Sequence, residues 1–150
     1  MNYTVRHIAL VVPDLRAAEE YYQQLFDMTI VTREAPLVDG LWYALPHDKR
    51  WENAVEAGID LAMVALRKDN LVLALFQGVA APGQVFAIGL YVAEAEIGRI
   101  RDRMPPDAII LDDKPDSLGF IDRYRINWQI STPGSEFQGS GDITGRWIPL

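Results

Sequence analysis

The stretch H-I-A-L-V-V-P-D-L-R-A-A-E-E-Y-Y-Q-Q-L-F-D-M, from His7 to Met28, decides the fold. Its opening is rich in β-branched and apolar residues as far as Val12, and Pro13-Asp14 ends this run, which predicts a strand. Asp14 can cap the next segment, in which apolar residues recur at spacings of three and four from about Leu15 to Phe26. The stretch therefore predicts a strand followed by an amphipathic helix that packs on a sheet.

Three further β-prone segments complete the first half of the chain. The first is Met28 to Glu34. The other two, Ile59 to Leu66 and Leu71 to Gln77, flank the polar turn Lys68-Asp69-Asn70, which predicts a hairpin. The first half thus has the order βαβββ.

An aromatic excursion, Ala35 to Gly58, interrupts this first half, and we expect a short helix within residues 48–57. Trp42, Tyr43 and Trp51 lie in it. Large aromatic side chains give much contact area, so they could close over a pocket or anchor the excursion on the core. The sequence leaves both alternatives open.

The second half of the chain repeats the order of the first. A strand from Val85 to Val92 precedes a helical stretch from Glu94 to Met104, and β-prone segments follow at 108–111, 120–131 and 136–138. I-A-L-V-V-P-D from Ile8 matches I-G-L-Y-V-A-E from Ile88 at an offset of 80 residues, since 88 − 8 = 80. We therefore predict one α+β domain at 1–150. Its two βαβββ modules, about 1–79 and 84–150, would form a curved mixed sheet around a cavity.

Composition excludes several classes of function. The net charge of −7 would repel a phosphate backbone, so nucleic acid is not expected as a partner. Without cysteine, any metal would need imidazole, carboxylate, amide or water ligands. No apolar run has the length of about 20 residues that a membrane span requires, and we expect a cytoplasmic protein that does not bind membranes.

Alternation along the strands predicts which side chains face the cavity. Ile8, Leu10 and Val12 would pack under the first helix, so the intervening side chains would point the other way. An apolar second face needs a cover, which a ligand in a cavity would supply. The residues that we expect to line it are His7, Ala9, Val11, Leu73, Leu75, Gln77, Gly89 and Tyr91, with Trp42 from the excursion.

The segment from His7 to Met28 resembles the opening of a vicinal oxygen chelate protein. This superfamily includes glyoxalase I, extradiol dioxygenases, fosfomycin resistance enzymes and bleomycin resistance proteins. S-T-P-G-S-E-F-Q, from Ser131, is similar to the turn before the family's last ligand strand. The resemblance covers both modules and weakens at 35–58 and 139–150, and it implies a homodimer.

The metal positions of the family, carried over by this resemblance, fall on His7, Gln77, Ala87 and Gln138. Ala87 has no donor atom, and two neutral amides would hold a hard cation weakly. The resemblance therefore implies no strong cofactor site and at most a weak divalent ion bound by His7, Gln77 and Gln138. Gln138 also belongs to the expected ligand-binding set, and no catalytic residue is assigned.

Three functional hypotheses remain. The first is a metal-independent protein that binds a small, partly apolar or aromatic molecule, as bleomycin resistance proteins do. The second is a divalent-metal-dependent lyase, isomerase or dioxygenase of the same superfamily. The third is a protein-interaction module whose exposed sheet docks a partner.

Overall fold

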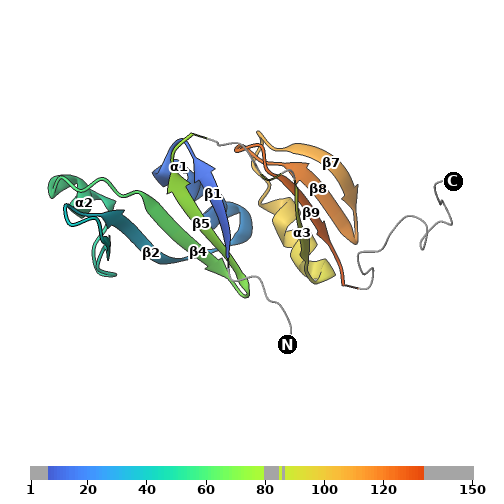
Figure 1. Cartoon of the computed structure of the whole chain (residues 1–150). Helices are drawn as coiled ribbons and strands as arrows, with labels where there is room; N and C mark the ends of the chain where they lie inside the picture. Colours follow the sequence, from blue (N-terminus) through green and yellow to red (C-terminus); the bar gives the residue numbers. More distant parts are fainter. Residues whose placement is uncertain (1–6, 80–84, 86, 134–150) are drawn as a thin grey trace, which may run out of the picture. The chain divides into compact units, whose positions relative to one another are not determined.

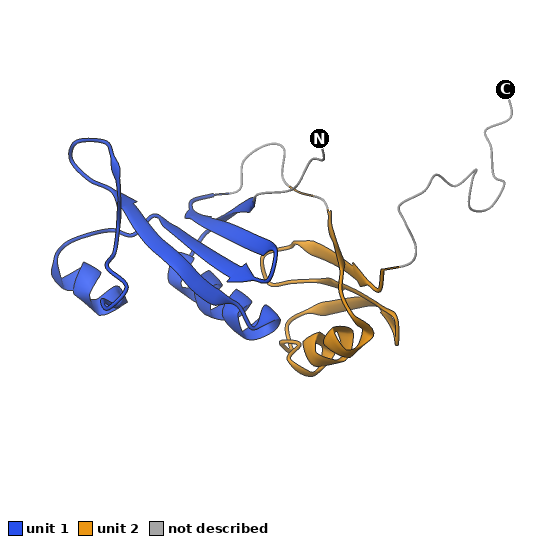
Figure 2. Ribbon diagram, turned by 90° about the horizontal axis from the view of Figure 1, so that it is seen from below, with its two compact units in different colours: residues 1–84 blue, residues 85–150 orange. Residues whose placement is uncertain are grey.

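The structure is a computed structural model that describes residues 7–79, 85 and 87–133. The chain divides into two compact units, unit 1 (Met1–Gln84) and unit 2 (Val85–Leu150), shown in blue and orange in Figure 2. Each unit combines one mixed sheet with a helix on one of its faces. The predicted α+β class with two βαβββ modules is confirmed.

Unit 1 contains a five-stranded sheet with the strand order β1-β5-β4-β2-β3. β1 pairs in parallel with β5, and the other neighbouring strands are antiparallel. Its elements, in chain order, are β1 (Ile8–Val12), α1 (Leu15–Phe26), β2 (Thr29–Pro36), β3 (Trp42–Ala44), α2 (Trp51–Glu56), β4 (Met63–Lys68) and β5 (Leu71–Gln77) (Figure 1).

Unit 2 contains a four-stranded sheet with the order β6-β9-β8-β7, in which β6 pairs in parallel with β9. Its elements are β6 (Ala87–Tyr91), α3 (Glu94–Asp102), β7 (Ile109–Lys114), β8 (Ser117–Ile121) and β9 (Asn127–Ser131). When β3 and α2 are set aside, the two units have the same order of elements and of strands in the sheet.

A shared irregularity supports the internal repeat. The register of β2 shifts between Ile30 and Thr32, and that of β7 shifts between Ile110 and Asp112. The two bulges lie 80 residues apart (110 − 30 = 80), which is the offset that aligns the first strands of the two modules. Bulges are specific structural features, so this coincidence extends the repeat beyond short sequence identities.

The strand and helix that open unit 1 follow the sequence pattern closely. The side chain of Asp14 accepts a hydrogen bond from the N–H of Ala17 at 3.0 Å and caps α1, as predicted. At the other end, Asp27 adopts the left-handed conformation, with φ of 53°. Leu10 and Val12 are buried, and α1 contacts β4 and β5 in the core of the unit.

The last two strands of unit 2 differ from the prediction. The β-prone run 120–131 is two strands, β8 and β9, joined by a tight turn at 122–126. Asp122 builds this turn by accepting hydrogen bonds from the N–H groups of Tyr124 and Ile126, while Arg125 has a positive φ of 66°. β9 is the last strand among the described residues, and the predicted strand 136–138 lies outside them.

No helix in the described part of the chain is long and apolar enough to cross a membrane.

Candidate functional site

The open face of unit 1 is the surface of its sheet that lies opposite α1. One row of paired residues crosses all five strands, and a second crosses four. The first row is Val11, Phe76, Met63, Glu34 and Ala44, and the second is Ala9, Ala74, Ala65 and Thr32. The second row is built from small side chains, so the surface is low there and mostly apolar.

Trp42 bounds this open face on the β3 side. Its ring meets that of Phe76 edge to face, with 6.2 Å between the ring centroids. β3 and β5 are separated by β4 and β2, which is three strand spacings of about 4.8 Å each. The indole must therefore lean across the sheet, over the row that contains Met63 and Glu34. This geometry agrees with the prediction that Trp42 faces the pocket side, and its ligand-binding role stays a prediction.

Glu34 places a carboxylate within this apolar surface. Its Oε1 accepts a hydrogen bond from Oγ1 of Thr32 at 3.0 Å, and its residue is half-buried. The hydroxyl orients one carboxylate oxygen, while Phe76, Met63 and Trp42 supply apolar contact area around the pair. A positioned carboxylate of this kind can act as a general base. Sequence reasoning missed it because the bulge in β2 hides the alternation of this strand.

Leu73 and Leu75 do not lie on the open face, and their predicted placement is wrong. Leu73 pairs with Ile8 and Leu75 with Leu10, so both share the face that α1 covers, and both are 0% exposed. The alternate residues of β5, including Ala74 and Phe76, lie beside Ala9 and Val11. The sequence L-V-L-A-L-F is apolar on both faces, and its periodicity cannot distinguish them.

Gln77 has a structural role at the start of α1. Its Oε1 accepts a hydrogen bond from the N–H of Leu15 at 2.9 Å, and its Nε2 donates to the carbonyl of Pro13. Both polar atoms of the amide are therefore engaged in fixing the turn from β1 to α1. Gln77 pairs with Val12 at the far end of β1 from His7.

A divalent ion implied by the fold family does not fit the donors predicted in unit 1. His7 precedes Val12, the partner of Gln77, by five residues, which is about 16 Å of strand. One ion cannot bridge them, because its ligands lie at about 2.0–2.6 Å. No group of three or more His, Cys, Asp or Glu residues suited to a metal occurs among the described residues. His7 itself is exposed, as are Ala9 and Val11, which agrees with their predicted face.

Unit 2 has its own open face, opposite α3. Ala87, Gly89 and Tyr91 lie on it as predicted, since Ile88 is buried on the other side. The partners of these three residues on β9 are Asn127, Gln129 and Ser131. These three β9 residues fall within the predicted β-prone run 120–131, but sequence reasoning sought the last site residue at Gln138, which lies outside the described residues. Trp128, which lies between Asn127 and Gln129 on β9, is 0% exposed and belongs to the core.

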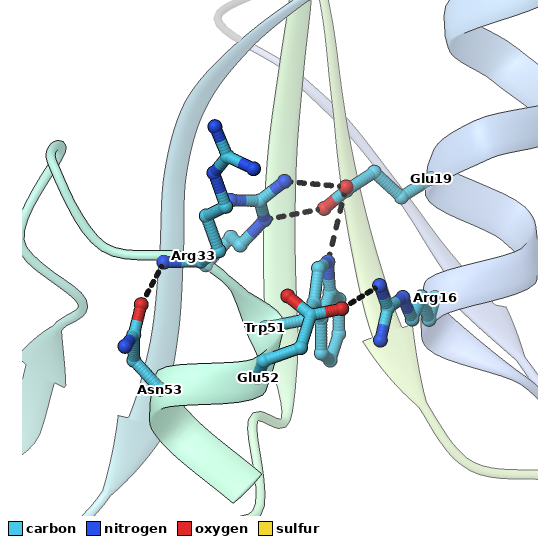
Figure 3. A network of polar contacts seen from close by, with 7 residues as sticks. Arg16, Glu19, Arg33, Trp51, Glu52 and Asn53 are labelled. Carbon is cyan, nitrogen blue, oxygen red and sulfur yellow. Dashed lines mark hydrogen bonds and ion pairs between the residues drawn. The ribbon is translucent and has the colours of Figure 1, made fainter.

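Trp51 anchors the excursion on the α1 side of unit 1 rather than on the open face. Its indole N–H donates to Oε1 of Glu19 at 3.1 Å, and the same carboxylate accepts two hydrogen bonds from Arg33 at 2.7 and 2.8 Å (Figure 3). The guanidinium carbons of Arg16 and Arg33 each lie 5.7 Å from the ring centre. Of the two alternatives for the excursion, closing over a pocket or anchoring on the core, Trp51 shows the second.

Arg16 adds an exposed ion pair to this cluster. Its Nη2 lies 2.5 Å from Oε1 of Glu52 (Figure 3). The hydrogen bond from Arg16 lowers the pKa of the Glu52 carboxyl below its ordinary value. The carboxylate in turn raises the pKa of Arg16. α2 is thus held to α1 by two contacts. Trp51 of α2 donates to the buried carboxylate of Glu19, and Arg16 of α1 pairs with the exposed carboxylate of Glu52.

Comparisons with solved structures place this fold. The chain resembles the fosfomycin resistance protein FosX of Mesorhizobium loti, with a TM-score of 0.60, 14% identity, and coverage of 89% of this chain and 94% of that one. It also resembles FosX of Listeria monocytogenes in complex with Mn(II) and sulfate (TM-score 0.57, 13% identity, 88% and 91% covered). A variant of the Listeria protein with Mn(II) and 1S,2S-dihydroxypropylphosphonic acid gives a TM-score of 0.58 at 13% identity, covering 88% of this chain and 93% of that one.

These neighbours have the vicinal oxygen chelate fold, so the fold expected from the resemblance is confirmed. No family model matches the chain, and no curated protein matches it in sequence.

Proposed function

We propose that this chain is an enzyme of the vicinal oxygen chelate type that acts on a small, partly apolar or aromatic molecule. The observation that carries the proposal is the half-buried carboxylate of Glu34, oriented by Thr32 within the apolar open face of unit 1. The fold shared with FosX proteins supports an enzyme over a passive binder. In this proposal the two units act as one domain, and the chain forms a homodimer.

Glu34 would serve as the general base of this reaction. A fixed carboxylate can take a proton from the substrate or from a water molecule, a contribution of about 10²- to 10⁴-fold in rate. Trp42 and Phe76 would hold the apolar part of the substrate over the low row of small residues. We assign no step to a metal ion, because Gln77 is engaged elsewhere and distant from His7.

A second candidate is binding without chemistry, the metal-independent function that the sequence first suggested. Two observations favour it specifically. Ala87 brings no donor to a position where the family places a ligand, and the amide of Gln77 is satisfied by α1. Such a protein would use Trp42 and the open face of unit 1 to sequester its ligand.

Turnover of fosfomycin, with and without MnCl₂, tests the enzyme proposal directly. Addition of water to fosfomycin gives dihydroxypropylphosphonic acid, and ³¹P NMR follows both species. We expect turnover by the wild type and a loss of about 100-fold or more in Glu34→Gln. Glu56→Gln, an exposed carboxylate at the end of α2, is the matched control and should keep full activity.

The other outcomes separate the two candidates. Saturable binding of fosfomycin without turnover would support sequestration, and neither binding nor turnover would contradict both functions for this ligand. Elemental analysis of wild type and His7→Ala, purified without chelator or nickel, tests the metal separately. Stoichiometric metal that disappears in His7→Ala would show that His7 is a ligand in spite of its distance from Gln77.

A further inference from the structure

The edge strand β7 of unit 2 carries a run of exposed apolar side chains. In the strand order β6-β9-β8-β7, β8 is the only neighbour of β7 among the described residues. Ile109, Ile110 and Leu111 are large and apolar, yet they are 58%, 47% and 55% exposed. Natural strand edges usually carry charges, because an apolar edge tends to associate with another chain. We call Ile109–Leu111 the β7 segment.

The internal repeat supplies a reference for the β7 segment. At the offset of 80 residues, the segment corresponds to Thr29–Val31 of β2. Thr29 is polar, and the two apolar residues after it are half-buried. The helices differ as well, since α1 has 12 residues and α3 has 9. The shorter α3 packs on β8 and β9, and Ile110 on the same side of the sheet stays exposed.

A second apolar run, at the edge strand β3 of unit 1, is less suited to association. Trp42 packs on Phe76, and Tyr43 donates its hydroxyl to Asp39, so both aromatic side chains have partners within unit 1. β3 has three residues, whereas β7 has six. The β7 segment is therefore the better candidate for an interface.

The C-terminal half of β7 is polar and already engaged. Asp113 accepts a hydrogen bond from Nε of Arg101 at 2.7 Å, and the carbonyl of Lys114 accepts one from Nη2 of the same arginine at 2.8 Å. Asp112 accepts one from Ser117 at 2.6 Å. Two copies aligned about Asp112 and Asp113 would also bring four carboxylates together, which is unfavourable. An intermolecular contact is thus restricted to the apolar N-terminal half.

We propose that the β7 segments of two copies of this chain pack against each other, antiparallel, about a two-fold axis near Ile110. In this alignment Ile109 of each copy meets Leu111 of the other. The same surface serves both copies, so the contact closes after two chains.

Charge is balanced on either side of this axis. The alignment brings Asp113 of one copy beside Asp107 of the second copy. Each of these carboxylates has its own arginine at 2.7 Å, Arg101 for Asp113 and Arg123 for Asp107. Two ion pairs therefore lie side by side, and neither carboxylate faces the other without a cation.

The bulge in β7 makes this contact weak. Bulges at sheet edges limit strand pairing, so packing of side chains contributes more than backbone hydrogen bonds. Small interfaces of this kind belong to transient complexes, and we expect association in the micromolar range. The proposed function includes a homodimer that rests on the family resemblance, and the β7 segment would give that homodimer a surface.

Sedimentation equilibrium of the full chain tests the contact. The average mass of the wild type should rise with concentration from 16.9 kDa toward twice this value. Leu111→Lys should weaken association by about tenfold or more, because a charge at the edge opposes pairing. Leu111 has no partner in the register of β7 with β8, so the variant keeps this ladder. Val55→Lys, at a 68% exposed valine on α2, is the matched control and should associate like the wild type.

Disulfide formation tests the position of the axis. The chain has no cysteine, so one introduced thiol can form a disulfide only with a second copy. Residues opposite each other in antiparallel strands have Cα atoms about 4.5–5.5 Å apart, which suits a disulfide. Ile110→Cys oxidised with diamide should give several-fold more covalent dimer than Val55→Cys. The indole N–H signal of Trp128, which donates to Asp122 at 2.8 Å, reports that each variant is folded.

Several results would overturn the proposal. One is a wild type that stays at 16.9 kDa up to millimolar concentration, and another is a mass that grows beyond twice this value, which indicates an open assembly. A dimer that Leu111→Lys leaves unchanged would place the homodimer of the proposed function on a different surface. Weaker association of Leu111→Lys without a disulfide in Ile110→Cys would mean that the segment contacts another part of the second copy. Neither experiment depends on fosfomycin turnover, so the enzyme proposal and this one can fail separately.

Discussion

In unit 1 the buried carboxylate of Glu19 accepts an indole N–H from Trp51, and in unit 2 the buried carboxylate of Asp122 accepts one from Trp128. Their other bonds differ. Glu19 accepts two hydrogen bonds from Arg33, whereas Asp122 accepts two from backbone N–H groups in its own turn. The first carboxylate joins elements distant in sequence, and the second shapes a turn between neighbouring strands.

The helices of the two units differ in the same way. α1 is capped by the side chains of Asp14 and Gln77, whereas α3 begins after Ala93 without a side-chain cap. α3 relies instead on packing of Ile97 and Ile100 and on exposed ion pairs such as Arg101 with Asp113. A repeated module can therefore keep its topology while its helix is attached by different chemistry.

The largest effect should come from breaking the buried pair of unit 1. Arg33→Ala leaves the carboxylate of Glu19, 3% exposed, without its cation, and we expect a loss of about 3–5 kcal/mol of unfolding free energy. Urea unfolding measures this loss for the whole chain, and hydrogen exchange of the α1 amides measures it locally. Arg99→Ala removes an arginine that is 58% exposed in unit 2 and should cost at most about 1 kcal/mol. Similar losses in both variants would contradict the difference between the units.

An intermediate effect is expected at the junction of β1 and α1. Gln77→Ala removes the acceptor for the N–H of Leu15 and should cost about 1 kcal/mol, a usual value for a helix cap. Gln24→Ala, on the exposed surface of α1, is the control and should change the free energy of unfolding by about 0.5 kcal/mol at most. If Gln77→Ala instead abolished the binding of fosfomycin without changing the free energy of unfolding, Gln77 would have a role in ligand binding and not the structural one.

The smallest effect concerns pH and the exposed pair of Arg16 and Glu52. The hydrogen bond from Arg16 lowers the pKa of Glu52 in the folded state. The pair therefore stabilises the fold above the unfolded carboxyl value of about 4.3, and the stabilisation is lost as pH falls through the lower folded pKa. The measurement is a pH titration of the NMR chemical shift of the Trp51 indole N–H in the wild type and in Glu52→Gln. This shift should change over the pH range just described in the wild type alone. A matching shift in the variant would point to another group.

Much of the fold was predictable because local signals agreed with tertiary structure. The proline and aspartate after Val12 end β1 and cap α1 as the sequence indicates. The turn between β8 and β9 was not predictable in this way, since it has neither glycine nor proline and depends on the side chain of Asp122. An aspartate at this position is the signal that could have revealed it.

The site was less predictable than the fold, and for particular reasons. β5 is apolar on both faces, so Leu73 and Leu75 could not be assigned to a face from sequence alone. The bulge in β2 obscured Glu34, and reading 120–131 as one run, without its turn at 122–126, hid the face on which Asn127 lies. Gln77 was recognised as polar at a strand end, but its partners at Pro13 and Leu15 follow from the parallel pairing of β1 with β5.

The clamp of Trp51 between two guanidinium groups has a consequence for protein engineering. It attaches the segment between β3 and β4 to α1, on the side of the sheet away from the proposed substrate face. Leu45 and Ala62 bond the backbone of β2 at Arg33 and Glu34, so the grafting points are residues 46–49 and 60–61, which can be exchanged or lengthened while Trp51 keeps α2 docked. Loop variation of this kind would alter the periphery of the protein and leave Glu34 and Trp42 in register.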